Sequence, residues 1–489
     1  MAEPALSAVI VGSGFSGLCA AIMLRRAGIK SFVILEKAER LGGTWRDNSY
    51  PGAACDIPSH LYAYSFEPNP SWSEAYGGQP EILAYLERCA AKYQLHEHLQ
   101  LKTRVVSATF DDGAATWTVR TADGRAFVAR ALVLGNGALH RPAIPALPGS
   151  STFTGTRFHT ARWDHDHNLT GKRVAVIGTG ASAVQLIPRI APLVEQLFVY
   201  QRTPPWVLPK ADRAIGRSEQ WLLHHVPGAH WLRRSGLYWL FESRAVGFVV
   251  APKLNHVVER FARTHLERQV RDPALRAKLT PSYLLGCKRV LVSNDYYPAL
   301  VRDNVELVTE AIDHVEPAAI RTSDGVQRDV DTIIYATGFK PAEYLSAVRI
   351  VGRNGTTLDD VWASSMRNYL GIAVAGFPNM FLLMGPNTGL GHNSMIFMIE
   401  AQARYAVSAI RAMRDNQLAA IDVRRDVEAS FGAEMARRMP NTVWTTGCNS
   451  WYMAPDGDVM LWPGFTFEYW RRTRRFELAD YQTTSVNAV

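Results

Sequence analysis

The feature that most constrains the fold is a glycine turn that occurs twice, each time between an apolar strand and a helix. In the first copy, SAVIVGSGFSGLCAAIMLRR, residues 9–11 form a short strand, and Gly12, Gly14 and Gly17 follow it as G-x-G-x-x-G. Residues 18–26 continue with helical spacing. The glycines allow a tight turn, close approach of a pyrophosphate, and close packing of helix on strand. The pattern predicts a dinucleotide site at the helix N-terminus, where free N–H groups favour anions.

An acidic residue ends the second strand of this unit. Glu36 lies 24 positions after Gly12, directly behind the apolar run FVIL. A carboxylate at this place accepts hydrogen bonds from ribose hydroxyls, and it would repel a 2′-phosphate. The first copy is therefore predicted to bind a dinucleotide with a free ribose, such as FAD.

The second copy, GKRVAVIGTGASAVQLIPRI, has the same layout with a different charge. Residues 174–177 and 197–200 are its strands, and Gly178, Gly180 and Ala183 form its turn. Arg202 stands 24 positions after Gly178, where the first copy has its acid. A guanidinium can hold a 2′-phosphate with two parallel hydrogen bonds, so this copy is predicted to bind NADP(H). Two such sites in one chain indicate electron transfer from nicotinamide to flavin.

These patterns predict an α/β fold with two Rossmann-like dinucleotide-binding domains. The segments 129–138 and 330–341 each contain an apolar strand followed by a glycine, and each would return the chain to one of the two sheets. We expect the first part of the FAD domain over 1–148, the NADP domain over 149–338, and the second part of the FAD domain over 339–489. Residues 212–280 have helical spacing and many aromatic and cationic side chains, which predicts a helical insertion in the NADP domain. It could cover a substrate channel, touch a membrane surface or simply pack as an amphipathic segment.

Composition excludes several other classes of protein. The five cysteines are odd in number, far apart and never spaced as C-x-x-C, which argues against a disulfide framework, a zinc site or a dithiol redox pair. We therefore expect no metal and a cytoplasmic protein. The N-terminus does not resemble a signal peptide, and no apolar run has the roughly 18 residues of a spanning helix, so no stable membrane insertion is expected. The net charge of +8 is interpreted as a surface suited to phosphate-bearing cofactors and not to nucleic acid.

Two longer motifs narrow the chemistry. The stretch FTGTRFHTARWD over 153–164 fits F-x-G-x-x-x-H-x-x-x-W-(P/D), and GGTWRDNSYPGAACD over 42–56 fits G-G-x-W-x-x-x-x-(F/Y)-P-(G/M)-x-x-x-D. On these motifs, with ATGF at 336–339 and TGCNSWY at 446–452, the sequence resembles the type I Baeyer–Villiger monooxygenases of the flavin-containing monooxygenase superfamily. The resemblance covers nearly the whole chain. Related flavin N- and S-oxygenases have a shorter fingerprint that lacks the Trp163–Asp164 ending, so this ending favours oxygenation of carbonyls.

The resemblance implies FAD and NADPH as cofactors and an activity on a small-molecule ketone and O2. One oxygen atom would be inserted next to the carbonyl through a flavin peroxide, giving an ester or lactone. Lys288 and Arg289 are adjacent cations in an apolar setting, which is costly unless each meets an anion. By resemblance, Lys288 joins Arg202 and Thr203 at the 2′-phosphate, whereas Arg289 is the catalytic cation that stabilises the peroxide and the tetrahedral adduct. Asp56 would orient Arg289.

The remaining site expectations also follow the resemblance. His159 is expected to have a gating role that couples cofactor position to domain orientation, with purely structural packing as the alternative. The full set of residues expected at the cofactors is Gly12, Gly14, Phe15, Ser16, Gly17, Glu36, Gly43, Thr44, Trp45, Asp56, Tyr62, Val106, Gly178, Gly180, Ser182, Ala183, Arg202, Thr203, Lys288, Gly385 and Trp451.

Other functions stay open at this point. A flavin monooxygenase that acts on nitrogen or sulfur nucleophiles is the alternative reading of the same motifs. A disulfide reductase of similar architecture is disfavoured because no redox cysteine pair is present. The identity of the ketone, the regio- and enantioselectivity and the oligomeric state do not follow from the sequence.

Overall fold

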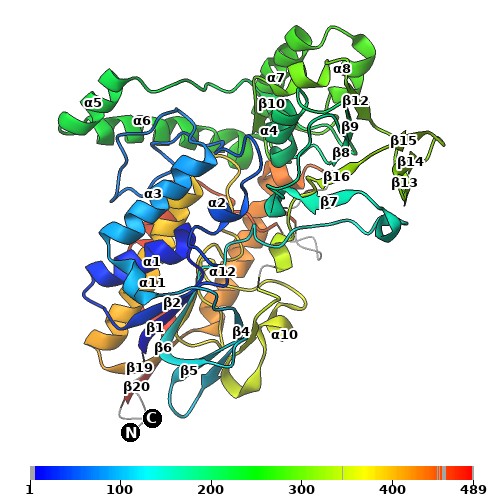
Figure 1. Cartoon of the computed structure of the whole chain (residues 1–489). Helices are drawn as coiled ribbons and strands as arrows, with labels where there is room; N and C mark the ends of the chain where they lie inside the picture. The colour runs from blue at the N-terminus through cyan, green and yellow to red at the C-terminus, as the bar shows by residue number, and fades with distance from the viewer. Residues whose placement is uncertain (1–5, 344, 449, 451, 454–458, 487–489) are drawn as a thin grey trace.

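Two separate β-sheets organise the chain (Figure 1). The structure is a computed structural model that describes residues 6–343, 345–448, 450, 452–453 and 459–486. The strands of the first sheet come from the N-terminal third of the chain and from residues 349–382, and those of the second from residues 156–335.

The first sheet is parallel around β1, with an antiparallel hairpin on one side. Its order is β17–β4–β5–β6–β1–β2–β3, and β18 also pairs with β6 in parallel. Strands β4 and β5 run antiparallel to each other, and β5 runs antiparallel to β6. The strands are β1 (Leu6–Val11), β2 (Phe32–Leu35), β3 (Leu99–Gln100), β4 (Val105–Asp111), β5 (Thr116–Thr121), β6 (Ala126–Leu134), β17 (Arg349–Val351) and β18 (Met380–Leu382).

The second sheet is parallel throughout, in the order β12–β9–β8–β16–β7. Its strands are β7 (Thr156–His159), β8 (Arg173–Ile177), β9 (Gln196–Tyr200), β12 (Val305–Val308) and β16 (Thr332–Tyr335). The two sheets repeat one scheme: β6 pairs with β1 as β16 pairs with β8. The strands expected in 129–138 and 330–341 are thus present as β6 and β16. The predicted α/β fold class with two Rossmann-like domains is confirmed.

Burial explains why the strand sequences are continuously apolar. The four residues of β2 and the four of β16 are all buried, as expected for parallel strands covered on both faces. Helices α1 (Phe15–Arg26) and α11 (Met395–Asp415) share a buried cluster with one face of the first sheet, in which Leu18 and Ile10 are fully buried. Helices α4 (Ala181–Ile190) and α9 (Tyr296–Leu300) form the corresponding cluster on the second sheet.

Helices occupy most of residues 217–279, between β9 and β12. They are α5 (Arg217–His225), α6 (Ala229–Ser243), α7 (Asn255–Gln269) and α8 (Pro273–Leu279). Helices α7 and α8 lie beside the second sheet, whereas α5 and α6 extend over the helices of the first half (Figure 1). Arg234 of α6 donates to the carbonyl of His60 at 2.8 Å, and the ring of Tyr238 stacks on Phe397 of α11 at 5.0 Å.

Further strands and helices complete the described part of the chain. The remaining strands are β10 (Val207–Leu208), β11 (Leu291–Val292), β13 (Ile312–Glu316), β14 (Ala319–Thr322), β15 (Gln327–Asp329), β19 (Leu418–Val423) and β20 (Tyr481–Ser485). The remaining helices are α2 (Thr44–Asp47), α3 (Gln79–Lys92), α10 (Leu358–Trp362), α12 (Arg425–Arg438) and α13 (Thr466–Thr473). Within the described residues, no helix has the length and apolar character needed to cross a bilayer.

One expectation about the cysteines was wrong. Cys287 and Cys448 form a disulfide, with their Cα atoms 6.1 Å apart, although 161 positions separate them in sequence. Pairing at this separation leaves no spacing signal, because a disulfide requires only that the two cysteines be close in the fold. Cys19, Cys55 and Cys89 are free and buried.

Candidate active site

The first glycine turn joins β1 to α1 and leaves the helix N-terminus open. Gly12 has a φ of +96°, and a Cβ at this residue would lie 2.7 Å from the carbonyl oxygen of Gly135, so only glycine fits. Gly14 is the N-cap of α1, and no side chain caps the helix. Phe15, Ser16 and Gly17 form its buried first turn. Uncapped N–H groups at a glycine turn fit the pyrophosphate of a dinucleotide.

Glu36 is fixed against this turn. Its carboxylate accepts hydrogen bonds from the backbone N–H of Ser13 at 3.0 Å and from the Ser13 hydroxyl at 2.7 Å. The guanidinium of Arg46 lies 3.1 Å from its second oxygen. Glu36 is buried, and the turn and Arg46 together hold its carboxylate where a ribose would follow the pyrophosphate.

The first signature segment folds over the same turn. Gly43 lies opposite Gly14, since a Cβ at Gly43 would be 3.0 Å from the Cα of Gly14. Thr44 and Trp45 begin α2, and the indole N–H of Trp45 donates to the Tyr62 hydroxyl at 3.1 Å. The structure therefore brings these predicted residues together beside the glycine turn.

Two predicted FAD residues lie on other elements. Val106 is in β4, which β5 and β6 separate from β1 in the sheet. Gly385 follows β18 and packs on the backbone of Gly371, and the Thr388 hydroxyl donates to the Gly385 carbonyl at 2.6 Å.

The second glycine turn has the same geometry as the first. Gly178 has a φ of +109°, and a Cβ there would lie 2.5 Å from the carbonyl oxygen of Ala336. Gly180 is the N-cap of α4 without a side-chain cap, and a Cβ on it would meet open space. Ser182 is half-buried and Ala183 fully buried in the first turn. This second open helix end also fits a pyrophosphate.

Two cations without anionic partners lie near each other beyond this turn. Arg202 is exposed and Lys288 half-buried, and neither has an ion-pair partner in the described part of the chain. Burial, and then the charge of Arg202, lower the pKa of Lys288. Thr203 joins them to the turn, because its carbonyl accepts from the Thr179 hydroxyl at 3.2 Å. Two uncompensated cations at this place fit the 2′-phosphate of NADP(H).

Arg289 and Asp56 form a bidentate ion pair between the two halves of the chain. Arg289 Nε and Nη2 each donate to one oxygen of Asp56 at 2.7 Å. The side chains are only 31 % and 23 % exposed. The charge of Asp56 raises the pKa of Arg289 above its ordinary value, against the opposing effect of burial. The guanidinium is therefore a permanent positive charge with a fixed orientation.

The loop that carries Asp56 is also bound to the second half. The hydroxyl of Tyr50 donates to Gln185 of α4 at 2.8 Å, and Gln185 donates to the carbonyl of Ala54 at 2.9 Å. Helix α4 begins at the second glycine turn. Hydrogen bonds thus link the loop that carries Asp56 to the helix that begins at the second glycine turn.

His159 is the last residue of β7. Its Nδ1 accepts from the backbone N–H of Ala161 at 3.1 Å, and its ring meets Phe339 edge-on at 5.7 Å. Burial lowers the pKa of His159 to about 4. A neutral imidazole that contacts the ATGF segment is suited to linking strands and not to exchanging protons at neutral pH.

Comparison with known proteins shows the family to which this chain belongs. The profile described as flavin-binding monooxygenase-like matches residues 6–416. Two proteins named Baeyer-Villiger monooxygenase are similar to this chain. The one from Pseudomonas aeruginosa is 46 % identical to this chain over 479 residues, and the one from Streptomyces coelicolor is 45 % identical over 478 residues. These matches cover 97 % of this chain and 91 % and 92 % of the relatives. The chain belongs to the flavin-binding monooxygenase-like family.

Solved structures of similar monooxygenases agree over the whole chain. A steroid monooxygenase bound to NADP has a TM-score of 0.89 at 33 % identity, covering 99 % of this chain and 100 % of its own. OTEMO in complex with FAD and NADP has a TM-score of 0.89 at 28 % identity, with the same coverage. Cyclohexanone monooxygenase from Rhodococcus sp. Phi1 bound to NADP+ has a TM-score of 0.88 at 29 % identity, again with the same coverage. This member of the family is accordingly a flavin- and NADPH-dependent monooxygenase.

Sequence analysis did not predict one residue of the candidate site, Tyr452. The Tyr452 hydroxyl lies beside the Arg289 guanidinium: burial raises the pKa of Tyr452, and the charge of Arg289 opposes that rise. Tyr452 is buried and follows the Cys287–Cys448 disulfide, which holds its segment next to Lys288. The TGCNSWY motif contains Tyr452, but the site residue expected from this motif was Trp451, which lies outside the described residues.

Proposed function

We propose that this monooxygenase inserts one oxygen atom of O2 next to a ketone carbonyl and releases an ester or lactone. The observation that carries the proposal is the Arg289–Asp56 pair. It supplies a fixed, half-buried positive charge between two dinucleotide turns. The Trp163–Asp164 ending of the fingerprint and the names of the relatives support the same chemistry.

The chain's residues divide between the two cofactors. Gly12, Gly14, Glu36 and Gly43 would hold FAD, and Gly178, Gly180, Arg202, Thr203 and Lys288 would hold NADPH. When bound, NADPH supplies the reducing equivalents and FAD activates O2 with them. We keep residues 148 and 338 as the proposed boundaries between the FAD and NADP parts.

Arg289 is proposed to act on charge that develops at the substrate. A nucleophilic attack on a ketone places negative charge on the carbonyl oxygen, and a preorganised guanidinium stabilises that charge without reorientation. Asp56 fixes the orientation of the guanidinium but leaves part of its surface free, since 31 % of the Arg289 side chain is exposed. Nearby aromatic and apolar side chains, among them Tyr62 and Tyr452, exclude water and strengthen the interaction.

His159 is proposed to couple cofactor position to domain orientation. It joins β7 to Phe339, at the point where the chain leaves the second sheet and returns to the first half. Trp451, which lies outside the described residues, remains a proposed NADPH-binding residue.

A substrate panel tests the function. Purified enzyme, NADPH and O2 are incubated with linear, cyclic and aryl ketones, and products are read by mass spectrometry for a gain of one oxygen from ¹⁸O2. A thioether and a tertiary amine are included in parallel. We expect esters or lactones from at least one class of ketone. Sulfoxide or N-oxide formation with no ester from any ketone would instead assign the enzyme to oxygenation of sulfur or nitrogen.

A further inference from the structure

The outward face of α6 is apolar. Trp231, Leu232, Trp239 and Leu240 are 70 %, 67 %, 58 % and 57 % exposed, and their spacing places them on one side of the helix. The same helix buries one apolar side chain, Phe241, and one charged side chain, Glu242. A surface helix of a water-soluble domain normally carries polar side chains on its outward face, so the exposed tryptophans are unusual.

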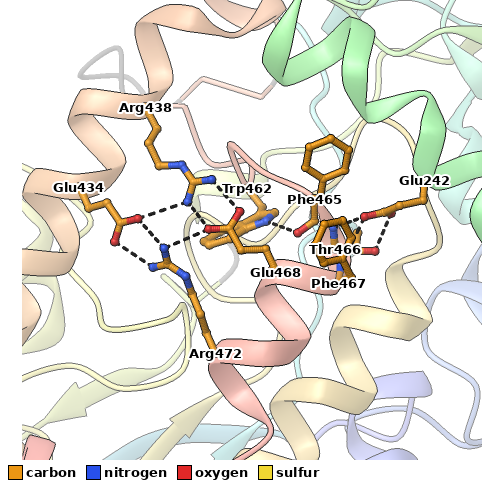
Figure 2. A network of polar contacts seen from close by, with 9 residues as sticks. All are labelled: Glu242, Glu434, Arg438, Trp462, Phe465, Thr466, Phe467, Glu468 and Arg472. Carbon is orange, nitrogen blue, oxygen red and sulfur yellow. Dashed lines mark hydrogen bonds and ion pairs between the residues drawn. The ribbon is translucent and has the colours of Figure 1, made fainter.

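Buried polar contacts fix this orientation of α6. The Glu242 carboxylate accepts hydrogen bonds from the Thr466 backbone N–H at 2.6 Å and from the Thr466 hydroxyl at 2.7 Å (Figure 2). It also accepts a hydrogen bond from the Asn393 side-chain amide at 2.7 Å. Rotating α6 to bury its tryptophans would take the buried Glu242 carboxylate away from these donors, and a buried charge without hydrogen-bond partners is strongly unfavourable. The apolar face is therefore held outward.

The exposed apolar side chains continue onto neighbouring helices. On α13, Phe467 lies 6.2 Å from Trp239 between ring centroids, and Trp470 lines a cavity of about 430 Å³ together with Trp231. On α5, Trp221 and Leu222 are exposed, and Glu219 of α5 lies 3.8 Å from Arg233 of α6. We call this surface the aromatic face: Trp221, Leu222, Trp231, Leu232, Trp239, Leu240, Phe467 and Trp470.

The charge around the aromatic face is positive. Residues 217–244, which include α5 and α6, contain four arginines and two acids, and residues 466–475, which include α13, contain four arginines and one acid. Of these acids, Glu242 is buried, Glu219 is paired with Arg213 at 2.7 Å, and Glu468 is paired with Arg438 at 2.7 Å. On α13 the guanidinium of Arg474 lies 5.8 Å from the ring of Trp470.

We propose that the aromatic face is a docking surface for an anionic lipid membrane, on which the enzyme rests without crossing it. Tryptophan beside cations is the composition that favours the boundary between lipid headgroups and acyl chains. Anionic headgroups complement the arginines, because cations near the membrane surface are attracted to its negative potential. A second copy of the chain fits less well, because a two-fold contact through this face would set the same cations against each other.

Vesicle co-sedimentation tests the proposal on the whole enzyme. We expect binding to vesicles of phosphatidylcholine with 30 % phosphatidylserine, weak binding to phosphatidylcholine alone, and release at 0.5 M NaCl. The double variant Trp231→Ser with Trp239→Ser should bind at least tenfold more weakly. Leu193→Ser is the matched control, because Leu193 is exposed and apolar but lies in the second half, outside the aromatic face. It should bind like the unmodified enzyme.

A second measurement does not depend on how the variants fold. Brominated phosphatidylcholine in the anionic vesicles should quench part of the tryptophan fluorescence of the unmodified enzyme. The proposal is overturned if the enzyme does not sediment with anionic vesicles or if brominated lipid does not quench. It is also overturned if light scattering finds a dimer that Trp239→Arg splits, since a second copy would then cover this face.

Discussion

Arg289 remains charged because Asp56 binds it through two hydrogen bonds of 2.7 Å. Replacing it with alanine should lower the rate of ester formation by about 10²–10³, the usual cost of losing one preorganised stabilising group. The flavin should still be reduced by NADPH, because the residues proposed to hold NADPH do not include Arg289. Stopped-flow absorbance follows reduction, and mass spectrometry follows the ester.

Arg289→Lys provides the comparison for that prediction, since it keeps the charge and loses the bidentate geometry. It should retain more activity than alanine and less than the unmodified enzyme. Unchanged ester formation in Arg289→Ala would remove Arg289 from the catalytic machinery.

Arg202 is expected to set the preference for NADPH over NADH. It has no anionic partner in the described residues and lies near Lys288. Charge-assisted hydrogen bonds contribute about 1.5–3 kcal/mol, so Arg202→Ala should lower kcat/KM for NADPH by about 10–100-fold and leave the value for NADH nearly unchanged. Steady-state kinetics with both cofactors measures the ratio. Arg268→Ala on α7 is the control, because that arginine is also exposed. An equal loss with both cofactors would contradict a role at the 2′-phosphate.

The sequence predicted residues whose positions the backbone pattern sets. Glu36 and Arg202 each follow the second strand of a glycine-turn unit, and the parallel sheet brings both strand ends beside their turns. Asp56, Lys288 and Arg289 required the family resemblance, because no local pattern relates residue 56 to residue 289. Tyr452 and the Cys287–Cys448 bond were missed because both depend on a contact between distant segments.

At the level of elements, the disulfide ties the segment before Lys288 to the segment before Tyr452. Cys448→Ser should lower the thermal unfolding midpoint, because a disulfide typically stabilises by about 2–4 kcal/mol. It should also raise KM for NADPH, since Lys288 adjoins the bond. Differential scanning fluorimetry and steady-state kinetics measure the two effects.

Cys89→Ser supplies the control for Cys448→Ser, since Cys89 is a free cysteine. Added reductant should shift the unmodified enzyme to the midpoint of Cys448→Ser and leave that variant unchanged. A midpoint unaffected by both reductant and substitution would show that the bond does not constrain the fold.

The elements themselves were predictable to different degrees. Residues 9–11 and 174–177 were expected as strands, and β1 and β8 contain them with one to three further residues at the start. The course of α6 over the first half was not expected, because the contacts of Glu242 and Arg234 that hold it there are to residues far away in sequence.

At the scale of the whole molecule, the contribution of two buried histidines to stability should fall between pH 6.5 and pH 4. Burial lowers the pKa of His159 and of His60 to about 4, from an ordinary value of 6.5. The unfolded chain therefore takes up these protons first as the pH falls, at a cost of about 1.4 kcal/mol for each unit of pKa difference. Asp422 acts in the opposite direction over this range, because burial raises its pKa to about 6, so a variant is needed to isolate a histidine.

His159→Asn separates the contribution of His159. Asparagine retains an acceptor for the Ala161 N–H but does not titrate, so unfolding midpoints at pH 7.5 and pH 5 should differ less than in the unmodified enzyme. If His159 has the proposed gating role, the variant should also form less ester for each NADPH oxidised at pH 7.5. Identical pH profiles would show that His159 does not titrate as described.

Asp56 and Arg289 come from opposite sides of the boundary between the two nucleotide-binding halves, and the loop of Asp56 is bound to helix α4. Any rotation of one half against the other must therefore break the contacts of this loop to one half or turn the ion pair. Where the pair turns, the direction of the guanidinium charge depends on the angle between the halves, and a change of cofactor state that alters that angle would also alter the electrostatic field at the proposed substrate site.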